Sequence, residues 1–148
     1  RIVEVGYATG EALSSFHAKT EPALAAGRWT GVVIAPEREA LYERINRRFD
    51  TMMEAGALEE VRQFRALGLD PSLPAMKALG VPPLIGHLQG ELPLQEAIEL
   101  AKRDSRRYAK RQMTWFRNQH ADWARIKSLD PDTRDTELDA ILGALKDG

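Results

Sequence analysis

The stretch WTGVVIAPEREALYERINRRF (residues 29–49) decides the fold, because its pattern changes within a few residues from strand to helix. Trp29–Ala35 is a short apolar run, rich in β-branched residues, that ends at Pro36, and this predicts a buried strand. After Pro36, apolar residues recur at spacings of three and four, which predicts an amphipathic helix. Proline suits the first turn of a helix, and the acids Glu37 and Glu39 suit its positive end.

A buried strand needs neighbours that satisfy its backbone groups, and this chain supplies few of them. Outside the first strand, the only other plausible strand lies near Trp123–Ser128. The chain also opens with RIVEV, without a methionine or a capping residue before it. We therefore expect a piece of a longer protein whose N-terminal part is absent.

The remaining pattern is mainly helical. Gly56 is expected to end the first long helix, and the clearest later helix is Leu94–Arg117, with one continuous buried stripe that runs through Ser105, Tyr108 and Phe116. Residues 1–8 fit a helix or a strand equally well. Weaker patterns predict further helices, loops and a C-terminal helix, in the order helix Glu11–Lys19, loop Pro22–Gly27, helix Leu58–Leu67, helix Pro74–Leu79, helix Pro82–Leu88, polar loop Asp130–Asp135 and helix Leu138–Leu145.

Composition excludes several classes of protein. The 148 residues suffice for one domain with a core, and a hydrophobic share of 43% with 29% charged residues is ordinary for a globular chain. The absence of cysteine excludes disulfides and thiolate metal sites. The apolar runs are too short to span a bilayer, and no signal peptide is visible, so we expect a cytoplasmic protein without a membrane partner.

The second half of the helix Leu94–Arg117 carries a dense run of positive charge. Asp104 is the one acid within the run, which consists of Lys102, Arg103, Arg106, Arg107, Lys110, Arg111 and Arg117. Like charges held this close destabilise a helix unless anions neutralise them, and nucleic-acid phosphates are suitable anions. Trp115 and Phe116 lie beside the run and could stack on a base. A solvated basic face with its aromatic residues in the core explains the same pattern equally well.

A second group of arginines lies on the helix after the first strand. Arg44 and Arg48 are four residues apart and share a face, so together they could clamp a diphosphate. The pattern by itself favours the simpler interpretation, in which the arginines of this helix pair with its own acids. The full group consists of Arg38, Arg44, Arg47 and Arg48.

Other catalytic patterns are missing from the sequence. The three histidines have no metal-ligand spacing, and no Ser/His/Asp grouping or glycine-rich phosphate loop occurs. None of the scattered acids stands out as a general base. The residues alone indicate a binding surface rather than a complete active site.

Several motifs in one collinear order resemble the tRNA dimethylallyltransferases. KRQMTWFRNQ (Lys110–Gln119) resembles that family's KRQ-x-TW-[LF]-R signature, and Arg1–His17 resembles its R-A-L-E-V-x-x-x-[ST]-G segment. Val32–Val61 resembles its strand followed by R-x-x-L-x-x-R-I-x-x-R-[VF]-x-x-M-x-x-x-G-x-x-x-E-V. The resemblance extends from Arg1 to about Trp123.

The resemblance implies the C-terminal part of an α/β fold of the phosphate-loop kinase type. Residues 1–128 would belong to the catalytic and tRNA-binding core, and residues 129–148 would form a polar loop and a helix. The implied reaction transfers a dimethylallyl group from dimethylallyl diphosphate to N6 of the adenine next to the anticodon. The phosphate-binding loop, the general base and the ligands of an implied Mg²⁺ would lie outside this chain, so it holds no catalytic residue and is expected to be inactive alone.

The motifs also imply binding roles for individual residues. Arg48, with Arg44, would reach the diphosphate. Trp115 and Phe116 would pack beside the RNA surface rather than stack on a base. The residues implied to contact the anticodon arm of tRNA are Arg1, Lys77, Gly80, Arg106, Lys110, Arg111, Gln112, Thr114, Trp115 and Arg117.

The sequence departs from the family in one segment and leaves alternatives open. Val81-Pro82 replaces a Tyr-Arg pair after Gly80, which removes one stacking group and one charge from a tRNA-contacting loop, although Lys77 keeps one charge. An enzyme that prenylates free adenine nucleotides, an RNA-binding module without chemistry and a helical interaction domain remain as rivals. We expect a monomer.

Overall fold

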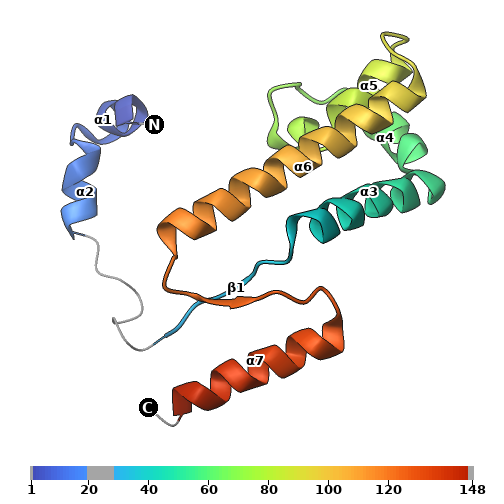
Figure 1. Cartoon of the computed structure of the whole chain (residues 1–148). Coiled ribbons are helices and arrows are strands. Elements are labelled where there is room, and N and C mark those ends of the chain that lie inside the picture. Colours follow the sequence, from blue (N-terminus) through green and yellow to red (C-terminus); the bar gives the residue numbers. More distant parts are fainter. Residues whose placement is uncertain (1, 20–28, 147–148) are drawn as a thin grey trace. The chain divides into compact units, whose positions relative to one another are not determined.

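The computed structural model describes residues 2–19 and 29–146, and the chain divides into two compact units, Arg1–Gly31 and Val32–Gly148 (Figure 1). The first unit contains α1 (Ile2–Thr9) and α2 (Leu13–Lys19), so the open choice at residues 1–8 is resolved as a helix. Thr9 closes α1 by donating its hydroxyl to the carbonyl of Val5 at 2.7 Å. The predicted loop Pro22–Gly27 lies outside the described residues.

The second unit contains a parallel pair of strands, β1 (Val32–Ile34) and β2 (Ala124–Ile126). The register pairs Val32 with Ala124 and Ile34 with Ile126. Val33 and Ile126 are buried, with exposed fractions of 4% and 2%. Both predicted strands are therefore confirmed, but each is shorter than predicted because the ladder extends over only three residue pairs.

Five helical segments form the body of the second unit. They are α3 (Arg38–Glu54), α4 (Ala57–Ala66), the 3₁₀ helix η1 (Pro74–Lys77), α5 (Val81–Leu88) and α6 (Leu94–Gln119). Gly56 separates α3 from α4 with a φ of 102°, which confirms the predicted break. The core consists of Phe49, Val61, Leu84, Ala97 and Ala101, where α3, α4, α5 and the first half of α6 meet.

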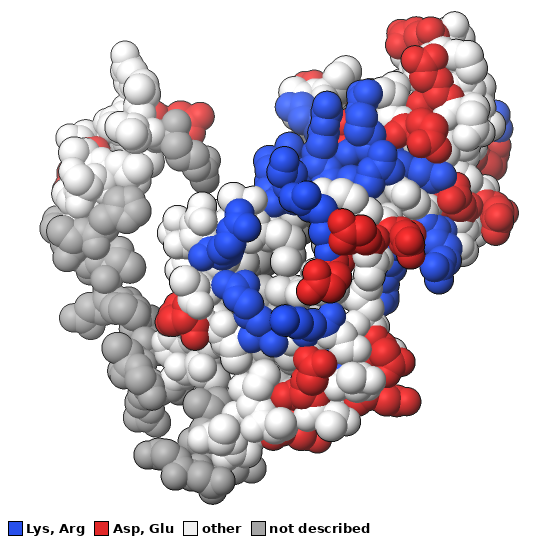
Figure 2. Space-filling model, viewed as in Figure 1, with Lys and Arg blue, Asp and Glu red and all other residues white. Residues whose placement is uncertain are grey.

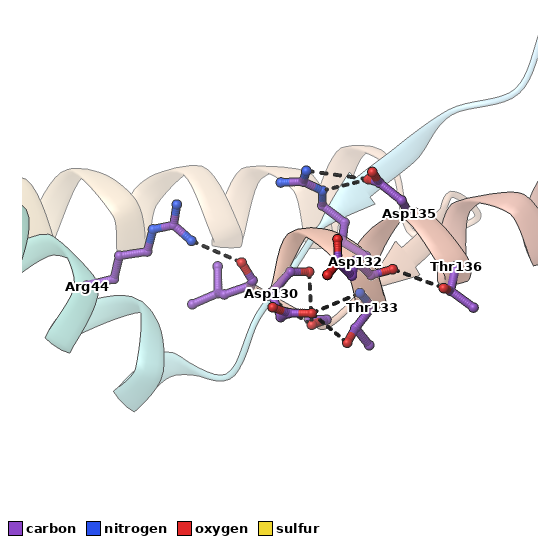
Figure 3. Close-up of polar contacts among 9 residues, drawn as sticks. Arg44, Asp130, Asp132, Thr133, Asp135 and Thr136 are labelled. Atoms are coloured by element: carbon purple, nitrogen blue, oxygen red, sulfur yellow. Dashed lines mark hydrogen bonds and ion pairs between the residues drawn. The ribbon is translucent and has the colours of Figure 1, made fainter.

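The predicted polar loop at Asp130–Asp135 is wrong, because α7 (Pro131–Lys146) begins there. The Asp130 carboxylate accepts hydrogen bonds from the backbone N–H of Thr133 at 2.9 Å and from its hydroxyl at 2.8 Å (Figure 3). Asp130 thus caps the helix, and Pro131 stands at the first helical position, where its missing N–H has no consequence. The polar residues at this position form a capping sequence, which has the same composition as a loop.

The buried stripe predicted along α6 is interrupted in its second half, where Ala109 is buried but other members are exposed. Ala97 and Ala101 are fully buried, whereas Tyr108 is 46% exposed and Gln112 is also exposed. The second half of the stripe lines a pocket instead of a core. The prediction of one continuous stripe fails there because a helical period shows which residues share a face, but not whether another element covers that face.

Candidate nucleic-acid interface

The basic run of α6 contains one lysine with an internal role. The Lys102 ammonium lies 2.6 Å from a carboxylate oxygen of Asp50 on α3 and 3.4 Å from Glu99, and its side chain is only 11% exposed. The hydrogen bond to Asp50 raises the pKa of Lys102 above its usual value. The expectation that Lys102 belongs to a phosphate-binding face is therefore corrected: it connects α6 to α3.

The next three arginines of α6 also have partners within the protein. Arg103 and Arg107 lie 3.9 and 3.6 Å from the carboxylate of Asp104. Arg106, which the sequence placed in the tRNA surface, is half-buried and donates a hydrogen bond of 2.5 Å to the side-chain oxygen of Asn46. The positive charge of α6 is consequently least compensated at its C-terminal end.

A shallow groove of about 520 Å³, here called the outer groove, lies along that end of α6. Four of the residues predicted to bind tRNA meet there, and three further polar residues complete it; the lining is Arg107, Lys110, Arg111, Thr114, Trp115, Asn118 and Gln119. Figure 2 shows basic side chains gathered along α6 in this part of the molecule. Because a single helix supplies the whole groove, its residues follow the helical spacing of three and four.

Trp115 gives the outer groove an aromatic face. Its ring packs edge-on against Phe116 and His120, with centroids 5.0 and 4.9 Å apart, yet 53% of the residue remains exposed. Phe116 is half-buried in the same cluster. Arg111 lies 5.7 Å from the ring centroid of Tyr108, within cation–π range. The groove thus combines cations with an exposed aromatic surface.

A larger cavity of about 540 Å³, the central pocket, lies between β1, α3 and the second half of α6. Its walls are mostly apolar, and Ile34, Phe49 and Met113 belong to them. Arg48 and Gln112, two of the predicted site residues, supply polar groups to this lining. The open half of the α6 stripe therefore faces a space that can hold an apolar group beside a guanidinium.

Arg44 and Arg48, the predicted diphosphate pair, line an open pocket of about 820 Å³ together with Arg47. This pocket, here called the arginine pocket, adjoins the central pocket, because both include Arg48, Met52 and Leu129 in their linings. Arg44 donates a hydrogen bond of 3.2 Å to the carbonyl of Leu129, in the segment that leads into α7 (Figure 3). Arg48 is exposed and lines this arginine pocket and the central pocket alike. The structure thus places Arg48 at a junction and uses Arg44 to hold the chain before α7.

Of the four predicted tRNA residues that remain, Lys77 and Gly80 lie apart from the outer groove, Arg117 lines another cavity, and one is outside the described residues. Arg1 is the residue outside the described part of the chain. Lys77 is exposed at the end of η1. Gly80 is buried with a φ of 93°, and a Cβ there would lie 2.9 Å from the ring of Phe49. Packing against the core explains this glycine without any contact to RNA.

Arg117 lines a separate small cavity with Lys110 and Thr114 from α6 and with Arg38 and Tyr42 from α3. Sequence reasoning missed Tyr42. In the outer groove it counted Arg107 in the basic run but not among the tRNA residues, and it missed Asn118. Helical spacing from Lys110 could have found both in the groove, at three residues before and eight after it. Nothing in the sequence indicated Tyr42, because its place depends on how α3 packs against α6.

The described residues show no site for the implied Mg²⁺. No group of three or more His, Cys, Asp or Glu side chains that could hold a metal occurs within residues 2–19 and 29–146. Among the described helices, none combines the length and the hydrophobicity that crossing a membrane requires.

Comparison with known proteins places the chain in a family. Residues 1–119 match the model of the IPP transferase family. The chain is 62% identical over 142 residues to the tRNA dimethylallyltransferase of Maricaulis maris. The aligned region covers 96% of this chain and 46% of that protein. It is 52% identical over 127 residues to the enzyme of the same name from a Caulobacter species, covering 86% of this chain and 41% of that protein.

Solved structures agree with this match. The tRNA isopentenylpyrophosphate transferase of Bacillus halodurans superposes with a TM-score of 0.68 at 35% identity, over 80% of this chain and 39% of that one. The tRNA delta(2)-isopentenylpyrophosphate transferase of Staphylococcus epidermidis superposes with a TM-score of 0.68 at 29% identity, over 99% of this chain and 47% of that one. The predicted fold class, a part of the phosphate-loop NTPase-like fold, is confirmed. The chain spans less than half the length of these relatives, and it belongs to the IPP transferase family.

Proposed function

We propose that the intact protein transfers a dimethylallyl group from dimethylallyl diphosphate to N6 of the adenine next to the anticodon of tRNA. The observation that carries this proposal is the outer groove, in which the KRQMTWFR segment presents Lys110, Arg111, Thr114 and Trp115 together. A relative 62% identical to this chain is named tRNA dimethylallyltransferase. Cations beside an exposed aromatic ring are typical of surfaces that hold structured or single-stranded RNA.

The reaction requires one bond to form and one to break. The adenine N6 forms a bond to the first carbon of the dimethylallyl group, the bond from that carbon to the diphosphate oxygen breaks, and N6 gives up a proton. The leaving diphosphate gains negative charge, which nearby cations stabilise. We propose that Arg48 supplies such a charge, since it lies where the apolar central pocket meets the arginine pocket.

Two further parts of the proposal lie outside the described residues. A Mg²⁺ ion would add positive charge at the diphosphate, but its ligands would come from other parts of the intact protein. The target adenine would have to leave its stack to reach the reacting carbon. The contribution of this chain is therefore to bind the RNA and to provide part of the pocket for the donor.

The proposal is tested by incubating the intact protein with an unmodified anticodon stem-loop and dimethylallyl diphosphate, followed by mass spectrometry of the RNA. The expected product carries the dimethylallyl group on the adenine next to the anticodon. Absence of product with the intact protein would refute the proposal. Product on free adenosine monophosphate, but none on RNA, would support a nucleotide prenyltransferase instead.

The role of the outer groove is tested by charge reversal. Lys110→Glu and Arg111→Glu should each weaken stem-loop binding and lower the slope of log affinity against log salt by at least about 0.7, the value for one phosphate contact to a single strand. Arg62→Glu is the matched control, because Arg62 is exposed on α4 and pairs only with Glu59. Equal affinities for the three variants would exclude the outer groove from RNA binding.

A further inference from the structure

The small cavity between the start of α3 and the last turns of α6, here called the inner cavity, has a volume of about 140 Å³. Its apolar part consists of Pro36, which is buried, and of Leu41 and Met113, which are half-buried. Its polar part consists of Arg38, Tyr42, Lys110, Thr114 and Arg117. Because Pro36 closely follows β1, the cavity lies beyond the carboxyl end of that strand, where α/β folds commonly bind ligands.

The charges around the inner cavity are all positive. Arg38, Lys110 and Arg117 line it, and no acid does. None of the three forms an ion pair with another described residue, and the guanidinium of Arg38 lies 6.0 Å from the ring centroid of Tyr42. On the same helix, Lys102, Arg103 and Arg107 each have a carboxylate within 4 Å. All three cations that line this cavity thus lack a counterion among the described residues, as Arg111 in the outer groove also does.

The size of the inner cavity limits what can neutralise this charge. Pockets for drug-sized ligands measure about 300–1,000 Å³, so a volume of about 140 Å³ suits a single small group. A phosphoryl group offers oxygen acceptors on several sides. The guanidinium groups, the ammonium and the hydroxyls of Thr114 and Tyr42 can all donate to such oxygens.

We propose that the inner cavity binds one phosphoryl group, held by Arg38 from α3 and by Lys110 and Arg117 from α6. This inference rests on the proposed function and adds Arg38 to the binding residues. The phosphoryl group comes either from the RNA backbone or from a diphosphate. Lys110 and Thr114 line the inner cavity and the outer groove alike, so a strand bound in the groove reaches the cavity without leaving the surface.

The test compares Arg38→Gln with the control Arg62→Gln in the intact protein. One set of measurements gives the dissociation constant of an unmodified anticodon stem-loop at several salt concentrations, and the other gives that of inorganic diphosphate by calorimetry. We expect Arg38→Gln to weaken one of the two ligands about tenfold, as the loss of a charge-assisted hydrogen bond does. Weakened RNA binding with a salt slope reduced by about 0.7 identifies a backbone phosphate, whereas weakened diphosphate binding alone identifies the diphosphate.

Arg117→Gln, which removes a cation from the other helix, provides a second variant should Arg38→Gln fail to fold. The proposal is overturned if the folded variants bind both ligands as tightly as Arg62→Gln does. Its failure is distinguishable from failure of the proposed function. Wild-type protein that prenylates RNA, with variants that bind normally, refutes only the phosphoryl site, whereas wild-type protein without RNA product refutes the transferase.

Discussion

At the scale of single residues, Gly80 shows how one position connects α5 to the core. Its φ of 93° is unfavourable for any other residue, and an added Cβ would meet the ring of Phe49 at 2.9 Å. We therefore expect Gly80→Ala to lower the free energy of unfolding by about 2–4 kcal/mol, through backbone strain and overpacking together. Urea denaturation of the intact protein measures this loss.

Gly68→Ala separates the two causes. Gly68 also has a positive φ, of 63°, but an added Cβ there would meet no atom within 4 Å. This variant should lose only the backbone contribution, about 1 kcal/mol. Equal losses for the two variants would show that contact with Phe49 does not determine the residue at position 80.

The ion pair of Lys102 predicts how the stability of the protein changes at alkaline pH. Its pKa is raised by the hydrogen bond to Asp50, so the folded state binds its proton more tightly than the unfolded chain does. The stabilisation is fully present below pH 10.5, the usual pKa of the group, and is lost as the pH rises through the higher value of the folded state. Lys102→Met should lower the free energy of unfolding by about 1 kcal/mol at neutral pH and should abolish this part of the alkaline loss.

Arg103→Met is the matched control for Lys102→Met. Arg103 lies on the same helix but is half exposed, and its closest carboxylate is 3.9 Å away. Its replacement should change stability by no more than about 0.5 kcal/mol. Denaturant titrations at neutral and alkaline pH compare the two variants, and indistinguishable curves would contradict an internal role for Lys102.

At the scale of the elements, the first turn of α7 depends on Asp130. This carboxylate accepts the backbone N–H of Thr133, and the same hydrogen bond holds the pKa of Asp130 below its usual 3.8. The cap therefore stabilises the helix above pH 3.8 and is lost as the pH falls through the lower value of the folded state. Asp130→Ala should make the amide of Thr133 exchange faster with solvent at neutral pH, as read by NMR.

Two variants check the capping role in α7. Asp130→Asn keeps an acceptor oxygen and should retain most of the protection at Thr133. Asp132→Ala removes a neighbouring carboxylate. Asp132 accepts the hydrogen bond from the hydroxyl of Thr136 through its backbone carbonyl, not through its side chain (Figure 3). Exchange that is unchanged in Asp130→Ala, or equally fast in Asp132→Ala, would show that the carboxylate of Asp130 does not cap α7.

The long helix α6 has two different roles along its length. Its first half buries Ala97 and Ala101 in the core and pairs Lys102 with α3. Its second half lines the central pocket on one face and the outer groove on another. The first half thus packs the helix into the core, whereas the basic second half supplies the walls of the pocket and the groove.

At the scale of the whole molecule, the second unit contains a parallel sheet of only two described strands, and Ile34 of that sheet is half exposed. Parallel sheets usually have both faces covered. We expect the isolated 148-residue chain to bind the anticodon stem-loop through the outer groove but to transfer no dimethylallyl group. Measuring both activities for the chain and for the intact protein checks this.

Two results would contradict the prediction for the isolated chain. Prenylated RNA from the chain alone would mean that its own residues complete the active site. A stem-loop affinity that does not fall with added salt would mean that Lys110, Arg111 and their neighbours do not contact phosphates. The intact protein serves as the positive control in both assays.

Much of the local structure was predictable from the sequence. Both strands, the break at Gly56 and the helix that became α6 follow from apolar periodicity and from proline and glycine, which act over a few residues. The start of α7 was missed because a capping sequence is composed of the same polar residues as a loop. The family was predicted from several motifs in one collinear order, and one of them, KRQMTWFRNQ, contains the four predicted tRNA residues that meet in the outer groove.

What the sequence alone determined is therefore the order of the elements, the family and the presence of a basic, aromatic segment at Lys110–Arg117. Only the tertiary structure decided which of the basic residues are available to a ligand. Lys102 pairs with Asp50 of α3, and Arg106 donates a hydrogen bond to Asn46 of the same helix. Arg38 and Tyr42 line the inner cavity because α3 packs beside the end of α6. Spacing along one helix fixes which side chains share a face, whereas their partners come from segments about sixty residues away, and only packing brings those segments together.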